Sequence, residues 1–507
     1  MKWRLGEGSN VALYEVGVED DGSLAGLPPA DMETSLITLS RMAAELGAEV
    51  SILQKTEVHN GNVVCEVLVR RIPAARDFME LRIAVTGGTD AGKSTLLGVL
   101  TRGDLDNGRG KARLNLLSHR HEIESGKTSS ISHEIIGFDA TGGLVNYASG
   151  NISSWEEICE KASRVISFVD LAGSEKYLRT TIAGLTGHSP NFVCLVVSGP
   201  AGVTTMTKEH LDIALAIDAP IFVVVTKVDC CTPPVFQKTL TSLIALVEKT
   251  GKKSSLITNE QNLAQATTDF CRSTACVPVF MVSCVSGQNL NLLTRFLGTV
   301  QNPDLRPTTP VHEGFTHFQV EDTYLNVPDV GLVVGGTMVS GRLFEGDVAL
   351  LGPDSDGKFY EVEVSSIHRQ RTPVSNAESG HHATLAFRSL PLPPAALRRG
   401  MSLVADRDGD HPPSACLEFD ASVMVLQHPS TLKANFQGTL HVGSVRQNAT
   451  VVSMKAAEAA PGEQTVVKLR FTRPEYLKTG AKLFFREGPV KIVGHVLRIY
   501  PMPAQRQ

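Results

Sequence analysis

The sequence predicts a multidomain protein in which an α/β domain lies between a small α+β domain and two all-β barrels. Three observations support this order. The length of 507 residues exceeds what one hydrophobic core can organise. In the middle of the chain, apolar strands alternate with helical segments, as in a parallel sheet covered on both faces. Beyond residue 305, short strands with closely spaced glycines and prolines are typical of barrels or sandwiches.

The first 78 residues are expected to form a β-α-β-β unit without a chemical motif. A strand is predicted over residues 10–18, and a helix capped by Asp31 follows it. Two further strands, 50–54 and 63–70, flank an Asn60-Gly61 turn. The buried face of the helix is expected to carry Leu36, Leu39, Met42, Ala43 and Leu46.

Residues 79–304 are expected to form the α/β domain. Its last helix, near 290–297, ends before a Pro- and Thr-rich linker that includes Pro303 and Pro307. The two barrels would then span residues 305–405 and 406–507. The five strands predicted for the parallel sheet are 81–85, 165–169, 193–197, 221–225 and 277–282.

The composition is that of a folded chain without a global charge field. The formal net charge is −5, so RNA or an acidic membrane would have to be contacted through local patches. Nine cysteines without a CxxC pair favour reduced thiols. The N-terminus lacks an apolar signal core, and the longest apolar runs are too short for a membrane span. We therefore expect a cytoplasmic protein without membrane insertion.

The most specific motif lies between a predicted strand and a predicted helix. It reads Gly87-Gly88-Thr89-Asp90-Ala91-Gly92-Lys93-Ser94, with Thr95 next in the helix. Its glycines let backbone amides wrap phosphates, Lys93 can reach the β and γ oxygens, and Ser94 can ligate Mg²⁺. A glycine-rich structural turn is the alternative. The flanking strand and helix favour a P-loop.

Three further segments follow predicted strands, at the sheet edge where ligands bind. Asp170 could hold the metal through water, and Gly173 could sense the γ-phosphate. Asp229 could accept hydrogen bonds from guanine N1–H and the 2-amino group, a pair of donors that adenine lacks on that edge. Each segment alone could be an ordinary strand end, but their joint order favours a guanine nucleotide. The other predicted members are Thr226, Lys227, Ser283, Cys284 and Val285.

A hydroxyl is also needed that closes over Mg²⁺ when the γ-phosphate is present. Thr128 is the candidate. Ser129, Ser130 and Ser132 are alternatives, and so is a polar loop without this role. The predicted metal ligands are therefore Ser94, Thr128 and, through water, Asp170.

These motifs resemble those of the GTP-binding protein 1 and 2 group, relatives of elongation factor Tu and eukaryotic elongation factor 1 alpha. The similarity extends over nearly the whole chain. The segments that carry it are residues 31–42, 90–100, 105–110, 121–126, 170–173, 207–211 and 226–229, and in the barrels 366–369, 443–447 and 485–488.

The resemblance implies a P-loop GTPase domain followed by two barrels, with GTP or GDP and Mg²⁺ as ligands. It implies the ribosome and tRNA as partners, with RNA-decay proteins as a further class, and we expect a monomer. The barrels would carry the tRNA contacts. Candidate phosphate contacts, or else ordinary solvated charges, are Arg369, Arg371, Arg398 and Arg399.

Three departures from the family pattern limit this inference. Ser174 follows Gly173, where the family has a histidine that helps orient the attacking water. Serine is too short and not cationic, so its presence could remove transition-state stabilisation while leaving nucleotide binding intact. Gly88-Thr89 replaces the usual Asn-Val of the phosphate loop, and Gly488-Pro489-Val490-Lys491 replaces the usual Gly-Arg-Thr.

Two functions remain open from sequence. One is a GTPase in which Lys93 and the loop amides stabilise charge, and the other is a GTP-dependent binding switch that turns over negligibly because of Ser174. A GTPase coupled to sulfate activation on a similar body is a third alternative. His188 and His210 are expected to be structural histidines. The Gly-, Asn- and Ser-rich segment 139–155 is expected to be a mobile loop.

Overall fold

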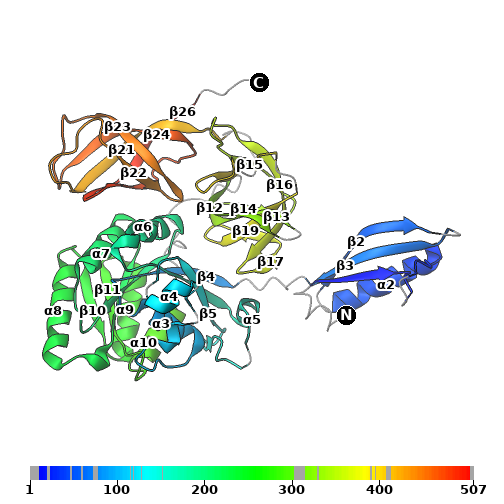
Figure 1. Cartoon of the computed structure of the whole chain (residues 1–507), viewed down its shortest axis with the longest axis horizontal. Helices are drawn as coiled ribbons and strands as arrows, with labels where there is room; N and C mark the ends of the chain where they lie inside the picture. Colours follow the sequence, from blue (N-terminus) through cyan, green and yellow to red (C-terminus); the bar gives the residue numbers. More distant parts are fainter. Residues whose placement is uncertain are drawn as a thin grey trace. The chain divides into compact units, whose positions relative to one another are not determined.

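The computed structural model describes residues 11–19, 23–45, 48–58, 61–71, 78–114, 116–117, 119–126, 128–150, 152–301, 315–327, 330–388, 391–393, 396–406 and 413–502. The chain divides into two compact units (Figure 1). The first comprises Met1–Asp77 with Thr372–Ser375, and the second comprises Phe78–Arg371 with Asn376–Gln507.

The N-terminal unit has the predicted β-α-β-β order. Strand β1 (Val11–Val16) pairs antiparallel with β3 (Val63–Arg71), and β3 pairs antiparallel with β2 (Ala48–Glu57). Helix α2 (Pro29–Glu45) packs its apolar side chains against this three-stranded sheet. The prediction of three strands and one helix in this unit is therefore confirmed.

Two details of helix α2 differ from the prediction. The helix begins at Pro29, so Asp31 lies in its first turn and is not the cap. Proline suits this first position because the amide it lacks would have no partner within the helix. Met42 is 49% exposed while Ala43 is fully buried, so the apolar face is narrower than predicted. Leu46 and Asn60 lie outside the described residues.

The α/β domain contains an eight-stranded sheet in the order β10-β11-β9-β8-β4-β7-β5-β6. The six strands from β10 to β7 are parallel; five of them were predicted, and β10 was missed. Strands β5 and β6 pair antiparallel at one edge, which the prediction of a parallel sheet did not include. The strands are β4 (Met79–Thr86), β5 (Ser132–Phe138), β6 (Leu144–Val145), β7 (Arg164–Asp170), β8 (Phe192–Ser198), β9 (Ile221–Thr226), β10 (Lys253–Ile257) and β11 (Cys276–Met281).

Both faces of this sheet are covered by helices, which explains its continuous apolar strands. On the central strand β4, Ile83 and Val85 enter one core while Ala84 enters the other. Helices α3 (Lys93–Arg102), α9 (Glu260–Arg272) and α10 (Leu290–Thr299) contribute to the first core. Helices α6 (Leu178–Gly187), α7 (Thr205–Ala216) and α8 (Pro233–Glu248) contribute to the second. Two short helices, α4 (Arg120–Ser125) and α5 (Trp155–Lys161), complete the domain.

The segment predicted to be a mobile loop contains ordered structure. Asp139 accepts hydrogen bonds from the amides of Thr141 and Gly143, both at 2.8 Å, and so closes a turn before β6. The Asn146 side chain then donates to Leu100 O at 2.9 Å and fixes the segment to helix α3. These hydrogen bonds hold the described part of the segment in this structure, and its predicted mobility stays a prediction.

Two barrels follow the α/β domain (Figure 1). The first closes in the order β15-β20-β12-β13-β19-β16, through the pairing of β16 with β15. The second is a closed barrel in the order β21-β24-β23-β22-β25-β26. The strands are β12 (Phe315–Val327), β13 (Gly331–Ser340), β14 (Arg342–Phe344), β15 (Val348–Gly352), β16 (Tyr360–Arg369), β17 (Thr372–Val374), β18 (Asn376–Glu378), β19 (His382–Phe387), β20 (Ser402–Asp406), β21 (Cys416–Gln427), β22 (Gln437–Val442), β23 (Val445–Met454), β24 (Gln464–Glu475), β25 (Lys482–Glu487) and β26 (Val490–Pro501).

A buried polar cluster joins the α/β domain to the first barrel. Glu321 lies 3.4 Å from Arg82 and 3.3 Å from His188, and it accepts a hydrogen bond from Thr337 at 2.6 Å. Burial acts to raise the pKa of Glu321, but Arg82 and His188 outweigh it and hold the pKa at about 2. A charge this deeply buried requires such partners. His188 is thus structural, as predicted.

The second barrel contacts the α/β domain through Lys491. Its Nζ lies 2.6 Å from Glu209 and 3.1 Å from Asp212, both on helix α7. The side chain of Lys491 is only 6% exposed, so these carboxylates are its means of neutralisation. Residues 488–491, where the sequence differs from the family pattern, therefore include a lysine that connects the α/β domain with the second barrel.

Four arginines predicted as phosphate contacts, or as solvated charges, each have a partner within the chain, although Arg371 is exposed and Arg399 is partly exposed. Arg369 is buried and donates to Phe78 O at 3.2 Å. Arg398 binds both carboxylate oxygens of Glu475, at 2.7 and 2.9 Å. The other two interact with Trp155 and Asp322: Arg371 stacks over the ring at 4.4 Å, and Arg399 lies 3.0 Å from the carboxylate.

Candidate nucleotide-binding site

The phosphate loop connects β4 to α3, and its glycines are required by its geometry. Gly87 has φ +146° and Gly92 has φ +91°, conformations that other residues rarely adopt. A β-carbon at Gly87 would lie 2.2 Å from Val196 O, and one at Gly92 would lie 3.2 Å from Thr226 Oγ1. The loop therefore passes directly over the ends of neighbouring strands. This arrangement leaves its backbone amides available to an anion.

Lys93 is buried at the base of this loop. Its Nζ donates to Gly87 O and Gly88 O, both at 3.1 Å. Burial lowers the pKa of Lys93, and the nearby carboxylates of Asp170 and Asp90 oppose that shift. A β-carbon at Gly173 would lie 2.5 Å from Lys93 Nζ, so only glycine lets the segment after β7 approach so closely. The P-loop and the D-x-x-G segment thus meet as predicted.

Three oxygen-bearing side chains converge beside Lys93. Ser94 Oγ donates to Asp170 Oδ2 at 2.5 Å and lies 3.0 Å from Thr128 Oγ1. Burial raises the pKa of Asp170, and Lys93 and Ser94 act against that rise. Within the described residues, Asp170 Oδ1 is buried without a hydrogen-bond partner. Two hydroxyls beside a carboxylate oxygen that can receive a bound water form a donor set that suits Mg²⁺.

Glu122 binds two of the three serines that were alternatives to Thr128. Its Oε1 accepts hydrogen bonds from the amide and hydroxyl of Ser129, at 2.6 and 2.7 Å, and from those of Ser130, both at 3.0 Å. Burial acts to raise the pKa of Glu122, but these hydrogen bonds outweigh it and lower the pKa to about 2. The two serines are therefore occupied. The sequence analysis did not single out Glu122.

The base-binding segments pack against the phosphate loop from the other side. Thr226 Oγ1 donates to Ala91 O at 2.6 Å, and Lys227, with φ +57°, donates to Asp90 O at 2.7 Å. The side chain of Asp229 is exposed. Burial acts to raise the pKa of Asp229, but hydrogen bonds from Ser283 and its neighbours outweigh it and lower the pKa. Asp229 is thus an ionised carboxylate at the surface, where it can accept hydrogen bonds.

The loop after β11 forms a tight turn next to this carboxylate. Ser283 Oγ accepts hydrogen bonds from the amides of Val285 and Ser286, at 3.2 and 3.0 Å. Cys284 O accepts from the amide of Asp106 at 2.9 Å. The predicted third base-binding segment therefore lies beside the second, as their order along the sheet implied.

Ser174 lines a small cavity of about 30 Å³ at the phosphate end of the site. Gly173, Thr128 and the P-loop line the same cavity, so Ser174 is where the family resemblance placed it. Arg113 and Gly126 also line it, and the sequence analysis missed both. The Gly-rich segment 105–110, just before Arg113, was the signal that could have identified this loop.

His210 does not substitute for the missing family histidine. Its Nδ1 accepts a hydrogen bond from the Gly87 amide at 3.0 Å, and it is fully buried. Burial, together with the charge of Lys93, lowers the pKa of His210 to about 3, so the ring is neutral at physiological pH. His210 thus supports the phosphate loop from below, as a structural histidine.

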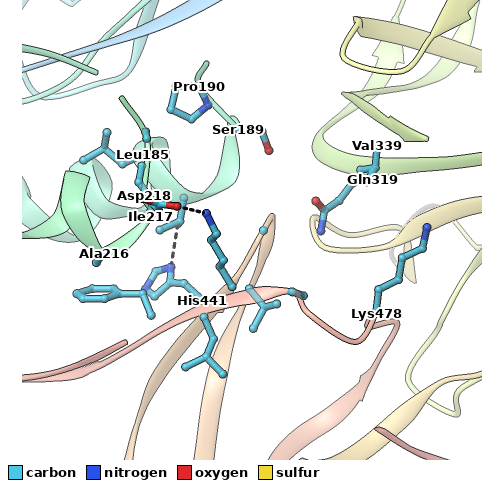
Figure 2. Close-up of a pocket in the computed structure, with 18 of the residues that line it drawn as sticks. Leu185, Ser189, Pro190, Ala216, Ile217, Asp218, Gln319, Val339, His441 and Lys478 are labelled. Carbon is cyan, nitrogen blue, oxygen red and sulfur yellow. Dashed lines mark hydrogen bonds and ion pairs between the residues drawn. The ribbon is translucent and has the colours of Figure 1, made fainter. Parts of the chain in front are cut away.

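A larger cavity of about 630 Å³ lies between the α/β domain and the two barrels (Figure 2). Figure 2 shows His441 and Lys478 of the second barrel along one side and Asp218 of the α/β domain along another. None of the predicted nucleotide-binding residues lines it. Size alone would therefore misplace the nucleotide site.

Residues 80–303 match the family described as the elongation factor Tu GTP binding domain. The chain is 45% identical over 515 residues to GTP-binding protein 2 of Mus musculus, covering 99% of this chain and 84% of that protein. The chain belongs to the GTP-binding protein 1 and 2 family. GTP-binding protein 1 of Xenopus laevis is 43% identical, over 98% of this chain and 75% of that protein.

The fold agrees with this membership. The GTPase-like domain of S. cerevisiae Ski7, solved with bound GTP, superposes with a TM-score of 0.61 at 13% identity, covering 83% of this chain and 98% of that chain. This family member thus has a domain of the elongation factor Tu GTP binding type followed by two barrels. In the described part of the chain no helix is long and apolar enough to cross a bilayer.

Proposed function

We propose that this family member is a cytoplasmic enzyme that binds GTP and GDP with Mg²⁺ and hydrolyses GTP. The convergence of Ser94, Thr128 and Asp170 beside the P-loop lysine carries this proposal. Residues 87–95 hold the phosphates, Asp229 and Lys227 select guanine, and the turn 283–285 supports the base. Gly173 reports the γ-phosphate by its contact with Lys93.

Hydrolysis requires a water to attack the γ-phosphorus while the bond to the β–γ bridging oxygen breaks. Mg²⁺, when bound, would neutralise charge on the β and γ oxygens, with Ser94 and Thr128 as ligands and Asp170 acting through water. The Lys93 ammonium, now on Gly87 O and Gly88 O, would exchange these carbonyls for phosphate oxygens. Because it is already buried and held, little reorganisation is needed.

We further propose that GTP controls contacts with tRNA and the ribosome, with RNA-decay proteins as a further partner class and the chain acting as a monomer. The supporting observation is a group of three arginines, Arg179 on α6, Arg399, and Arg446 at the start of β23. Burial lowers the pKa of Arg446, and the charges of Arg179 and Arg399 lower it further. Neighbouring guanidinium groups of one sign favour a polyanion. Arg179 lies five residues after Ser174, in the segment that follows the γ-phosphate sensor.

The RNA proposal is tested by filter binding of tRNA in GTP and in GDP. Arg446→Gln is expected to weaken tRNA binding while GTP affinity stays unchanged. The slope of the logarithm of the tRNA binding constant against the logarithm of salt concentration should fall by about the value of one phosphate contact. The control is Arg498→Gln, an exposed arginine on β26 outside the cluster. Equal loss in both variants, or binding that ignores the nucleotide, would overturn the proposed site.

A binding switch with negligible hydrolysis is the second candidate function, and Ser174 favours it. The serine lines the phosphate cavity without a group that could hold a water as histidine does. Single-turnover hydrolysis, measured with and without ribosomes, separates the two functions. If ribosomes stimulate GTP cleavage by the wild type and Ser174→His raises the rate little, the binding-switch function is contradicted. If Ser174→His raises the rate greatly, the proposal that the natural sequence is an active GTPase is contradicted.

A further inference from the structure

The loop between α3 and α4 is organised around one buried carboxylate. Asp106 is 6% exposed, and its two oxygens accept hydrogen bonds from the amides of Gly108, Gly110 and Ala112, at 2.9, 3.0 and 3.0 Å. Its own amide donates to Cys284 O at 2.9 Å, which fixes the loop to the base-binding turn. The loop is therefore held in one shape at the edge of the nucleotide site.

This loop presents Arg113 to the phosphate cavity. The guanidinium lies between two glycines of positive φ: Gly110, at +82°, and Gly126, at +65°. A β-carbon at Gly110 would lie 2.6 Å from Arg113 Nε, and one at Gly126 would lie 2.5 Å from an Arg113 terminal nitrogen. Both glycines thus make room for the side chain. Gly126 stands two residues before Thr128, so the guanidinium lies beside the segment that reaches Ser94.

The cavity that Arg113 lines also includes Lys93, Ser94, Gly173 and Ser174. Within the described residues, the structure records no ion pair between Arg113 and an acidic side chain. The guanidinium is therefore close to two glycines and lines the cavity at the phosphate end of the site. Arginine in such a position can contact a phosphate through two nitrogens at once.

We infer that Arg113 is a catalytic residue that binds the γ-phosphate of GTP and stabilises its charge in the transition state. The inference rests on the proposed GTPase function. As the water oxygen bonds to the γ-phosphorus, the bond to the β–γ bridging oxygen breaks and GDP keeps that electron pair. The water's proton leaves to phosphate or solvent. Arg113 neutralises the charge that accumulates on the bridging and γ oxygens, and so offsets part of what Ser174 cannot supply.

The test is single-turnover hydrolysis of GTP at saturating enzyme, with and without ribosomes. Arg113→Ala is expected to slow cleavage about 10³-fold, the scale of an arginine acting on a transferring phosphoryl group. Affinity for GDP should stay within about threefold, because GDP lacks the γ-phosphate. Lys111→Ala is the matched control: it removes one positive charge from the same loop, at an exposed position.

Two further measurements separate a catalytic role from a structural one. GDP with aluminium fluoride mimics the transferring phosphoryl group, so wild type and Lys111→Ala should bind it and Arg113→Ala should not. Ser174→His should not restore the wild-type rate to Arg113→Ala, because a histidine that orients the water does not neutralise the charge on the γ oxygens.

The outcomes distinguish this inference from the proposed function. If Arg113→Ala cleaves GTP at the wild-type rate and still binds GDP with aluminium fluoride, the proposed role of Arg113 is overturned. The proposed GTPase function would then still stand. Absence of cleavage by wild type under every condition would overturn both. If Arg113→Ala also loses GDP binding, Arg113→Lys is the second variant. Recovery of GDP binding without recovery of cleavage in Arg113→Lys would support a catalytic role. Recovery of both would indicate a structural role.

Discussion

Glu122 is predicted to control how well the protein distinguishes GTP from GDP. Its carboxylate oxygen accepts four hydrogen bonds from Ser129 and Ser130, which follow the proposed metal ligand Thr128. Glu122→Gln removes the charge from these bonds, and charge-assisted bonds are about twice as strong as neutral ones. The expected loss in the free energy of GTP binding is about 1–3 kcal/mol. Because Thr128 acts on the γ-phosphate side, GTP binding should weaken while GDP binding stays unchanged.

A coupling of that size corresponds to about a 5- to 150-fold change in relative affinity. The assay is the ratio of dissociation constants for a fluorescent non-hydrolysable GTP analogue and fluorescent GDP, at fixed Mg²⁺. Glu248→Gln is the control, since Glu248 is exposed at the end of α8. An unchanged ratio in Glu122→Gln, when Thr128→Ala raises it, would refute the reasoning that Glu122 positions Thr128.

Three more predictions concern the base, the barrel contact and acid stability. Asp229→Asn should weaken GTP about 100-fold or more and favour xanthosine triphosphate, whose second carbonyl accepts from an amide; competition binding measures both. Lys491→Met leaves Glu209 with less compensation, so urea unfolding should show a loss of about 1–3 kcal/mol, against about 0.5 or less for the exposed Lys482→Met. Glu321 has a pKa of about 2 when folded, below the usual 4.5, so its stabilisation is complete above pH 4.5 and lost as pH falls through about 2. Melting temperatures from pH 6 to 3 should fall less steeply in Glu321→Gln than in wild type.

The elements that were predicted well from sequence are those that local patterns determine. Strands β8 and β9, beside the P-loop, are nearly continuous apolar runs, and the left-handed conformations at Gly87 and Gly92 restrict those positions to glycine. The antiparallel strand β5, next to the edge strand β6, was missed because its residues mix polar and apolar side chains, with His133 and Glu134 at its start. Such a strand has no pattern that marks it as part of a buried sheet.

The parts of the site that sequence left open depend on contacts between distant residues. Ser129, Ser130 and Ser132 stood as alternatives to Thr128 as metal ligands, and the hydrogen bonds of Glu122 now account for Ser129 and Ser130. The roles of Arg369 and Arg398 depend on partners far away in the chain. A basic residue that pairs with a carboxylate 77 positions away, as Arg398 does with Glu475, looks the same in sequence as a free one.

Helix α7 shows how neighbouring residues of one motif can serve two parts of the molecule. His210 supports the Gly87 amide at 3.0 Å, and Glu209, the preceding residue, binds Lys491 of the second barrel at 2.6 Å. Successive residues on a helix point in directions about 100° apart, so one turn can face both the phosphate loop and the barrel. The segment 207–211 could be interpreted from sequence only as a family resemblance. In the structure, this segment of helix α7 connects the loop that would bind phosphate with the second barrel, whose last strand differs from the family pattern.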